Sequence, residues 1–195
     1  GPVTGSAAAA PTRQAGLPPA AWVATLFFVA AETMVFAGLL FFFLAYRLWS
    51  PVWPPLGEPR LPLGVTVVNT AILLVSGFAM RHAVRLARAG AGPAARRALV
   101  TTAALGWAFL AVQGSEWVRL LHWGLTAVGS PYGGIVYVLL GGHGVHVLAA
   151  VVWLLAVAPA GRRPLPPAHR LEACALYWYF VCALWLAIFA VVYLA

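Results

Sequence analysis

Three of the four carboxylic acids in this sequence lie within or at the edge of long apolar stretches. They are Glu32, Glu116 and Glu172, whereas Glu58 lies in a proline-rich connection. Ionisable groups in hydrocarbon are costly and need partners, so each of the three is a candidate functional residue. Glu32 lies in the middle of AAETMVFAGLL. We interpret it either as a proton relay or subunit contact, or as a neutral acid with a structural hydrogen bond only.

The other two acids have an arginine close by in the sequence. Arg119 follows Glu116 by three residues in QGSEWVRLLHW, which places both on one helix face. This spacing indicates an ion pair near the lipid headgroups, and a pocket for a lipid headgroup is the alternative. Glu172 follows Arg170 where the last apolar stretch begins. There we expect the backbone dipole at a helix N-terminus to stabilise the carboxylate.

His143 and His146 occur in GGHGVHVLAA, three residues apart and thus on one side of a helix. Such a pair suits metal binding or proton relay, but a metal needs further ligands and no other apolar stretch offers a clear third. The neighbouring Gly141, Gly142 and Gly144 favour close helix packing instead. We therefore predict no metal site on this chain, with both histidines in interior hydrogen bonds as the simpler interpretation.

The remaining polar groups of the apolar stretches are uncharged. Asn69, with Thr70 and Ser76 nearby, is of the type that forms hydrogen bonds between membrane helices. The sequence contains no dinucleotide-binding glycine motif, no phosphate-binding loop and no HExxH zinc motif. With five histidines in all, the chain has too few ligands to carry oxygen or electron chemistry alone.

The elements that position these residues are predicted to be membrane-spanning helices. Of the 195 residues 63% are hydrophobic and 8% are charged, far from the roughly 25% charged residues of soluble domains. A span needs about 20 apolar residues. Five such stretches occur, near residues 20–47, 62–80, 98–121, 134–158 and 171–194. The fold class is therefore all-α, a five-helix membrane domain over 20–195, preceded by a loosely ordered tail at 1–19.

The arginines predict how these helices are oriented. Nine of the twelve lie in the tail, in the connection predicted at 81–97 and in that at 159–170, all on one side of a five-span bundle. By the positive-inside rule the N-terminus is cytoplasmic and the C-terminus outside. Because the basic residues lie between apolar runs, the net charge of +8 does not indicate a nucleic-acid partner. We expect a multi-pass protein of a bacterial plasma membrane.

The same segments, in the same order, resemble subunit III of the haem–copper oxidases. AAETMVF resembles the family's Ser-Glu-x-x-x-Phe helix, with Glu32 at its acid and Ala31 in place of Ser. The other matches, each similar to a family segment, are LPLGVTVVNTAILLVSG through Asn69, Thr70 and Ser76, VQGSEW through Gln113, Glu116 and Trp117, GGHGVHV through His143 and His146, and LEACALYWYFVCALW through Glu172, Tyr177, Trp178, Phe180 and Trp185. The length fits the five-helix form of the family.

This resemblance implies an accessory, non-redox role in aerobic respiration, within an enzyme that couples oxygen reduction to proton pumping. Subunit III binds no metal; it packs against the catalytic haem–copper subunit I, carries phospholipid in a cleft and supports proton uptake. Haem and copper are then expected on partner subunits, subunit II among them, and Glu32 is the intramembrane carboxylate that faces the catalytic subunit. The chain would be a non-catalytic part of a cytochrome c or quinol oxidase.

The last helix departs from the family pattern. Tyr179 occupies the family's His position, Cys182 its Asp position and Leu176 its first Trp position. Two other functions remain open at this point: an accessory subunit of a related nitric oxide reductase, and a stand-alone b-type cytochrome anchor that uses His143 or His146. A small transporter is less consistent, because the sequence has no inverted repeat.

Overall fold

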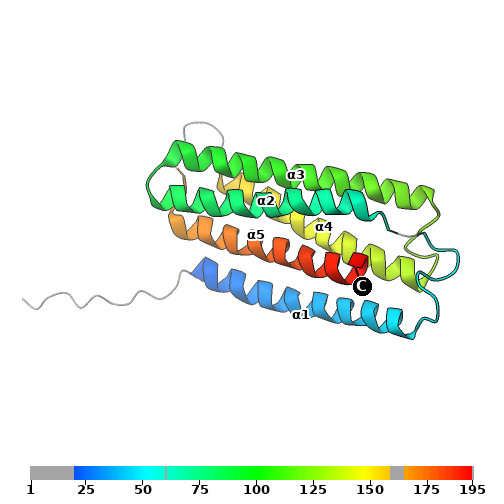
Figure 1. Cartoon of the computed structure of the whole chain (residues 1–195). Helices are drawn as coiled ribbons and strands as arrows, with labels where there is room; N and C mark the ends of the chain where they lie inside the picture. The colour runs from blue at the N-terminus through cyan, green and yellow to red at the C-terminus, as the bar shows by residue number, and fades with distance from the viewer. Residues whose placement is uncertain (1–19, 60, 159–164, 195) are drawn as a thin grey trace, which may run out of the picture.

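The computed structural model describes residues 20–59, 61–158 and 165–194, and this part of the chain is a bundle of long helices (Figure 1). The helices are α1 (Ala20–Trp49), α2 (Leu63–Arg88), α3 (Gly92–His122), α4 (Pro131–Val157) and α5 (Ala168–Ile188), which continues into a π-helical turn, η1 (Phe189–Leu194). Within these described ranges, five helices are long and apolar enough to cross a membrane. The predicted all-α, multi-pass architecture is thus confirmed; the tail at 1–19 lies outside the described residues.

Several helices are longer than the apolar stretches predicted. The segment 81–97, expected as a connection, is helical except for residues 89–91, because α2 continues to Arg88 and α3 begins at Gly92. A helix does not have to end where its apolar stretch ends, since Arg carries its charge on a long apolar stem that reaches the interface. The arginines of this segment therefore lie on helices, on defined faces.

Local sequence explains where the helices begin and end. The side chain of Ser130 caps α4 by accepting a hydrogen bond from the backbone N–H of Gly133 at 3.0 Å, and Pro131 occupies the first helical position. After α2, Gly90 has a φ of +74°, a left-handed conformation that glycine adopts without steric cost. These short connections make sequential helices antiparallel (Figure 1).

The core lies where α5 meets α2, α3 and α4. Among its largest fully buried side chains are Trp178 and Trp185 of α5 and Phe109 of α3. The indole N–H of Trp178 donates to Ser76 Oγ at 3.1 Å, and that of Trp185 donates to Thr70 Oγ1 at 2.9 Å. Both bonds join α5 to α2, so the two tryptophans fix the relative rotation of these helices.

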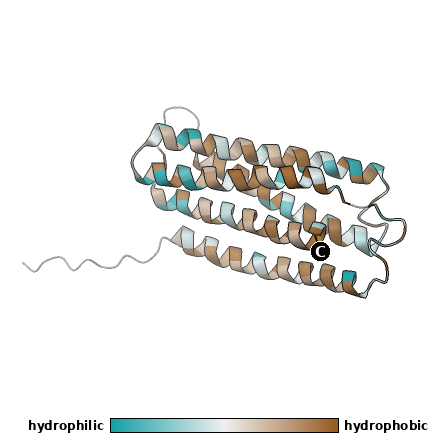
Figure 2. Cartoon of the chain, in the orientation of Figure 1, coloured by the Kyte–Doolittle hydropathy of each residue, from teal (hydrophilic) through white to brown (hydrophobic). Residues whose placement is uncertain are grey.

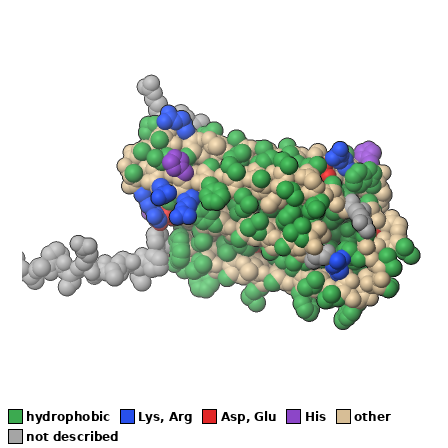
Figure 3. Space-filling model, in the orientation of Figure 1, with side chains coloured by type: hydrophobic (Ala, Val, Ile, Leu, Met, Phe, Trp, Pro, Cys, Tyr) green, Lys and Arg blue, Asp and Glu red, His purple; other side chains and the backbone are tan. Residues whose placement is uncertain are grey.

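Helix α1 differs from the rest, because it packs on α5 and α4 at the edge of the bundle (Figure 1). Only Thr25, Phe36 and Phe43 are buried among its 30 residues. On the face drawn in Figure 3, hydrophobic side chains extend along the bundle and the cationic side chains lie toward its two ends; the helices are mostly hydrophobic along their length (Figure 2). This distribution suits a protein whose sides face lipid and whose ends face water.

Candidate functional site

A carboxylate–imidazole pair lies near the middle of the bundle, between its edge helix and the core. Glu32 of α1 and His146 of α4 meet with 3.1 Å between Glu32 Oε2 and His146 Nε2. Glu32 lies twelve residues into α1, about 18 Å from its start at 1.5 Å per residue. The side chains are 24% and 17% exposed, so the pair is largely enclosed by the chain with one side open to the surroundings.

The hydrogen bonds define where the proton of this pair can reside. His146 Nδ1 lies 2.6 Å from the carbonyl oxygen of Gly142. A carbonyl only accepts, so Nδ1 carries a hydrogen and Nε2 is the nitrogen that faces Glu32. One proton then occupies the Glu32–His146 axis, either on the carboxyl group or on Nε2. The site can therefore hold a proton and pass it between two atoms without changing its net charge.

Apolar rings surround the pair. The ring of Phe36, one turn along α1 from Glu32, meets the imidazole of His146 edge-on at 5.2 Å between centroids. The same ring covers Gly142, where a Cβ atom would come within 3.3 Å of Phe36 Cζ. The glycine thus lets the ring approach α4 closely and pack against the imidazole.

His143 has different surroundings, although it lies one helical turn from His146. It is fully buried, stacked on Trp185 at 5.0 Å and edge-on to Phe109 at 5.7 Å. Neither ring nitrogen has a hydrogen-bond partner in the part of the chain that the structure describes, so the interior hydrogen bond expected for His143 is wrong, because aromatic rings surround it. The two histidines therefore contact different neighbours rather than one shared ligand. Among the described residues, no three His, Cys, Asp or Glu side chains come close enough to hold a metal.

Asn69 lies in the seam between α2 and α3. Its Nδ2 donates to the carbonyl oxygen of Phe109 at 3.3 Å and to Oε1 of Gln113 at 3.4 Å. Asn69 is 1% exposed and Gln113 is 4% exposed. This geometry supports a role for Asn69 in joining the helices, and no sequence signal had connected it with Gln113.

Glu116 and Arg119 form an ion pair along α3, with 2.8 Å between Oε1 and Nη1. The partners differ in burial, since 4% of the Glu116 side chain is exposed against 57% of the Arg119 side chain. The arginine thus reaches from the surface to satisfy a buried acid, and the second carboxylate oxygen has no hydrogen-bond partner.

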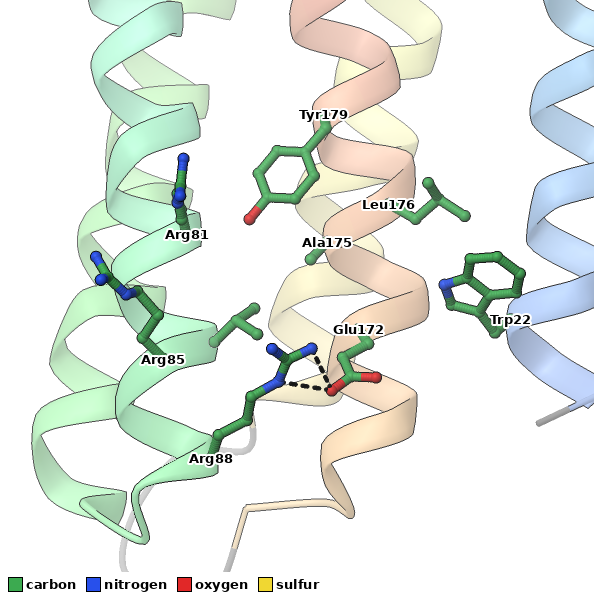
Figure 4. Close-up of a pocket in the computed structure, with 9 residues that line it drawn as sticks. Trp22, Arg81, Arg85, Arg88, Glu172, Ala175, Leu176 and Tyr179 are labelled. Atoms are coloured by element: carbon green, nitrogen blue, oxygen red, sulfur yellow. Dashed lines mark hydrogen bonds and ion pairs between the residues drawn. The ribbon is translucent and has the colours of Figure 1, made fainter. Parts of the chain in front are cut away.

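Glu172 requires a correction. It was expected at the helix N-terminus beside Arg170, but α5 begins at Ala168 and no acid lies in its first turn. Its Oε1 instead lies 2.9 Å from both Nε and Nη2 of Arg88, on α2 (Figure 4). Because α5 starts earlier, Glu172 lies level with the last turn of α2. A contact between two packed helices that are far apart in the sequence therefore replaces the predicted local interaction.

The comparisons with known proteins agree with one another. The sequence model of the family described as "Cytochrome c oxidase subunit III" matches residues 14–195. The "Cytochrome c oxidase subunit 3" of Synechocystis sp. is 36% identical over 171 residues, which cover 86% of this chain and 72% of that protein. The "Probable cytochrome c oxidase subunit 3" of Nocardia farcinica is 35% identical over 176 residues, covering 88% and 86% of the two chains. That of Mycobacterium tuberculosis is 31% identical over 175 residues, with the same coverage.

Proposed function

Since the chain belongs to the cytochrome c oxidase subunit III family, and is thus an accessory subunit of a haem–copper oxidase, we propose that it braces the catalytic subunit through α1 and supports proton uptake through the Glu32–His146 pair. The redox groups, haem and copper, belong in this proposal to partner subunits I and II. The complex lies in a bacterial plasma membrane, with the N-terminus of this chain on the cytoplasmic side.

The pair between Glu32 and His146 carries the proposal. A carboxyl group in the middle of a span is energetically costly unless it has a partner, and such groups usually mark functional sites. Its partner, His146, is oriented by the backbone carbonyl of Gly142. The open side of the pair offers the shared proton to an adjacent subunit, which a carboxylate fully enclosed within this chain could not do.

The outer face of α1 suits a partner helix. Phe27, Met34, Phe41 and Leu48 recur every seventh residue and are 72%, 78%, 75% and 73% exposed. Bulky side chains with this period form the ridge that packs along a neighbouring helix. At 100° per residue, Glu32 lies roughly 140–180° round the helix from the residues of this ridge. Helix α1 can therefore bind the partner with one face and hold the acid in the seam with another.

The test is the oxidase purified with Glu32→Gln in this subunit, which keeps a hydrogen bond but removes the titratable proton. We expect normal haem content and subunit composition, a shorter active lifetime during turnover and slower proton uptake. Thr33→Val is the matched control, because Thr33 is exposed on α1 and its hydroxyl donates within that helix, to the carbonyl of Val29. If the Glu32→Gln enzyme keeps the lifetime and pumping of the control, the pair has no role in proton uptake.

The orientation has its own test. The described arginines gather mainly at the end formed by the α2–α3 connection and the start of α5, whereas Arg47 and Arg119 lie at the other end (Figures 1 and 3). Arg13, Arg60, Arg162 and Arg163, also used in the prediction, lie outside the described residues. Periplasmic alkaline phosphatase fused to the C-terminus should be active. An inactive fusion that is made and inserted would reverse the orientation.

Phospholipid is the remaining component of the proposal. The bundle presents hollows between its helices that are open at the surface, one of them at the arginine-rich end and another between α3 and α4. Lipid in such hollows adds contacts between the subunit and its membrane without any covalent attachment.

A further inference from the structure

A pocket of about 600 Å³ opens between α1, α2 and α5 at the arginine-rich end of the bundle (Figure 4). It has a basic wall on α2 and an apolar wall between α5 and α1. The residues that matter here are Arg81, Arg85, Arg88, Tyr179, Leu176 and Trp22. The arginines lie on α2, Tyr179 on α5 and Trp22 on α1, so the spacing of these residues in the sequence does not predict the pocket.

The basic wall carries more positive charge than the described acidic side chains near it neutralise. Arg81, Arg85 and Arg88 follow one another at spacings of four and three, so they lie on one face of α2. Of the described residues that line the pocket, Glu172 is the only acid, and it binds Arg88. Three positive charges and one negative charge leave a net charge of +2.

Among the described residues, no other glutamate side chain is available to complete the balance. Glu32 pairs with His146 and Glu116 pairs with Arg119, while Glu58 lies in the connection between α1 and α2, at the other end of the bundle. Within the described residues, no acid forms an ion pair with Arg81 or Arg85. The helix dipole does not explain Arg81 either, because that residue lies seven positions before the end of α2 and the dipole acts within the last turn.

The pocket also has the two-part character of a lipid. The phenol of Tyr179 points toward the side of α2 that carries Arg81 and Arg85, and its hydroxyl can donate a hydrogen bond there (Figure 4). On the other side, Leu176 lies between Tyr179 and the indole of Trp22 on α1 (Figure 4). A small free anion would use only the first part, whereas an amphiphile with a charged head and an apolar body uses both.

We propose that this pocket binds an anionic phospholipid, with its phosphate between Arg81 and Arg85. Tyr179 donates a hydrogen bond to the phosphate, and an acyl chain lies along Leu176 and Trp22. The residual charge of +2 favours a headgroup with a net negative charge, such as phosphatidylglycerol, over a zwitterionic one. The inference rests on the proposal that the subunit carries phospholipid, to which it adds the site and the lipid class.

The experiment uses the intact oxidase complex, purified in mild detergent, stripped of lipid by washing and titrated under native mass spectrometry. The probes are dioleoylphosphatidylglycerol, dioleoylphosphatidylcholine and inorganic phosphate. We expect phosphatidylglycerol to bind saturably. Phosphatidylcholine should bind more weakly, and inorganic phosphate should not bind. A basic residue near anionic lipid contributes about 1 kcal/mol, so Arg81→Ala with Arg85→Ala should weaken binding about thirty-fold.

Two further variants keep the result interpretable. Arg97→Ala is the matched control, because Arg97 is an exposed arginine at the same end of the bundle but lies on α3 and does not line the pocket. It should bind phosphatidylglycerol as the wild type does. Tyr179→Phe should weaken binding without disturbing assembly, and it tests the site if the double alanine variant does not assemble.

Several results would overturn the inference. Equal binding of phosphatidylcholine would remove the charge preference, and equal binding of inorganic phosphate would make this an anion site without a lipid. A complex that binds no added lipid here because an acidic segment of a partner fills the pocket would refute it as well. Failure of this subunit to purify with a haem–copper subunit would instead refute the accessory role, so the two failures are distinguishable.

Discussion

Replacing Gly106 by alanine should test the packing of the core most directly. Gly106 lies in α3 where that helix meets α4 and α5. A Cβ atom added there would lie 2.8 Å from Trp178 Cη2 and 2.8 Å from Val151 Cγ2. Both side chains are buried, at 1% and 0% exposure, so neither has open space to move into. The added methyl group therefore has to push the helices apart or force the indole from its position.

The size of the effect follows from two opposing contributions. Overpacking a well-packed core costs about 1–3 kcal/mol. We expect the upper part of that range, because the indole of Trp178 is held by its hydrogen bond to Ser76. Alanine gains up to about 1 kcal/mol over glycine through helix propensity. The net result is a loss of about 2 kcal/mol, or roughly thirty-fold in the ratio of folded to unfolded protein.

The assay is unfolding by sodium dodecyl sulfate in mixed micelles, followed by the near-ultraviolet circular dichroism of the tryptophans. Gly114→Ala is the control, on the same helix, since a Cβ atom at Gly114 meets nothing within 4 Å. It should be neutral or slightly stabilising. Adding Val151→Ala to Gly106→Ala should restore part of the loss. If the Gly106→Ala and Gly114→Ala variants are equally stable, α3 does not approach α4 and α5 as closely at Gly106 as the structure shows.

Three further substitutions probe individual contacts. Arg119→Ala should destabilise by about 1–3 kcal/mol because the buried Glu116 loses its partner, and adding Glu116→Gln should restore most of this in the same titration; no recovery would contradict the pairing. Arg88→Ala should lower the free energy of unfolding by less than about 1 kcal/mol, and by less still in high salt, because its ion pair with Glu172 is exposed. A large loss of stability that does not depend on salt would be inconsistent with an exposed pair. Ser76→Ala should cost about 1 kcal/mol and shift the emission of Trp178, whose indole N–H loses its acceptor; an unchanged spectrum and midpoint would exclude that bond.

Much of the architecture could be predicted because the signals for it are local. Each span is a property of its own 20 or so residues, and the prolines between spans end helices without reference to the rest of the chain. The sequence therefore predicts the five spans, and the motifs within them indicate the family. The helix ends were less predictable, since α2 continues through Arg81 and Arg85 to Arg88, beyond its apolar stretch.

The polar partners in the membrane were decided by the tertiary structure. The sequence singled out Glu32 and His146 separately, but 114 positions separate them and only the packing of α1 on α4 brings them together. The same holds for Glu172, whose expected local stabilisation is replaced by Arg88 of α2. Which side chains meet depends on the rotation of each helix about its axis, and side chains from every facing helix set that rotation together. The types of polar residue can thus be read from the sequence, while their pairing belongs to the assembled bundle.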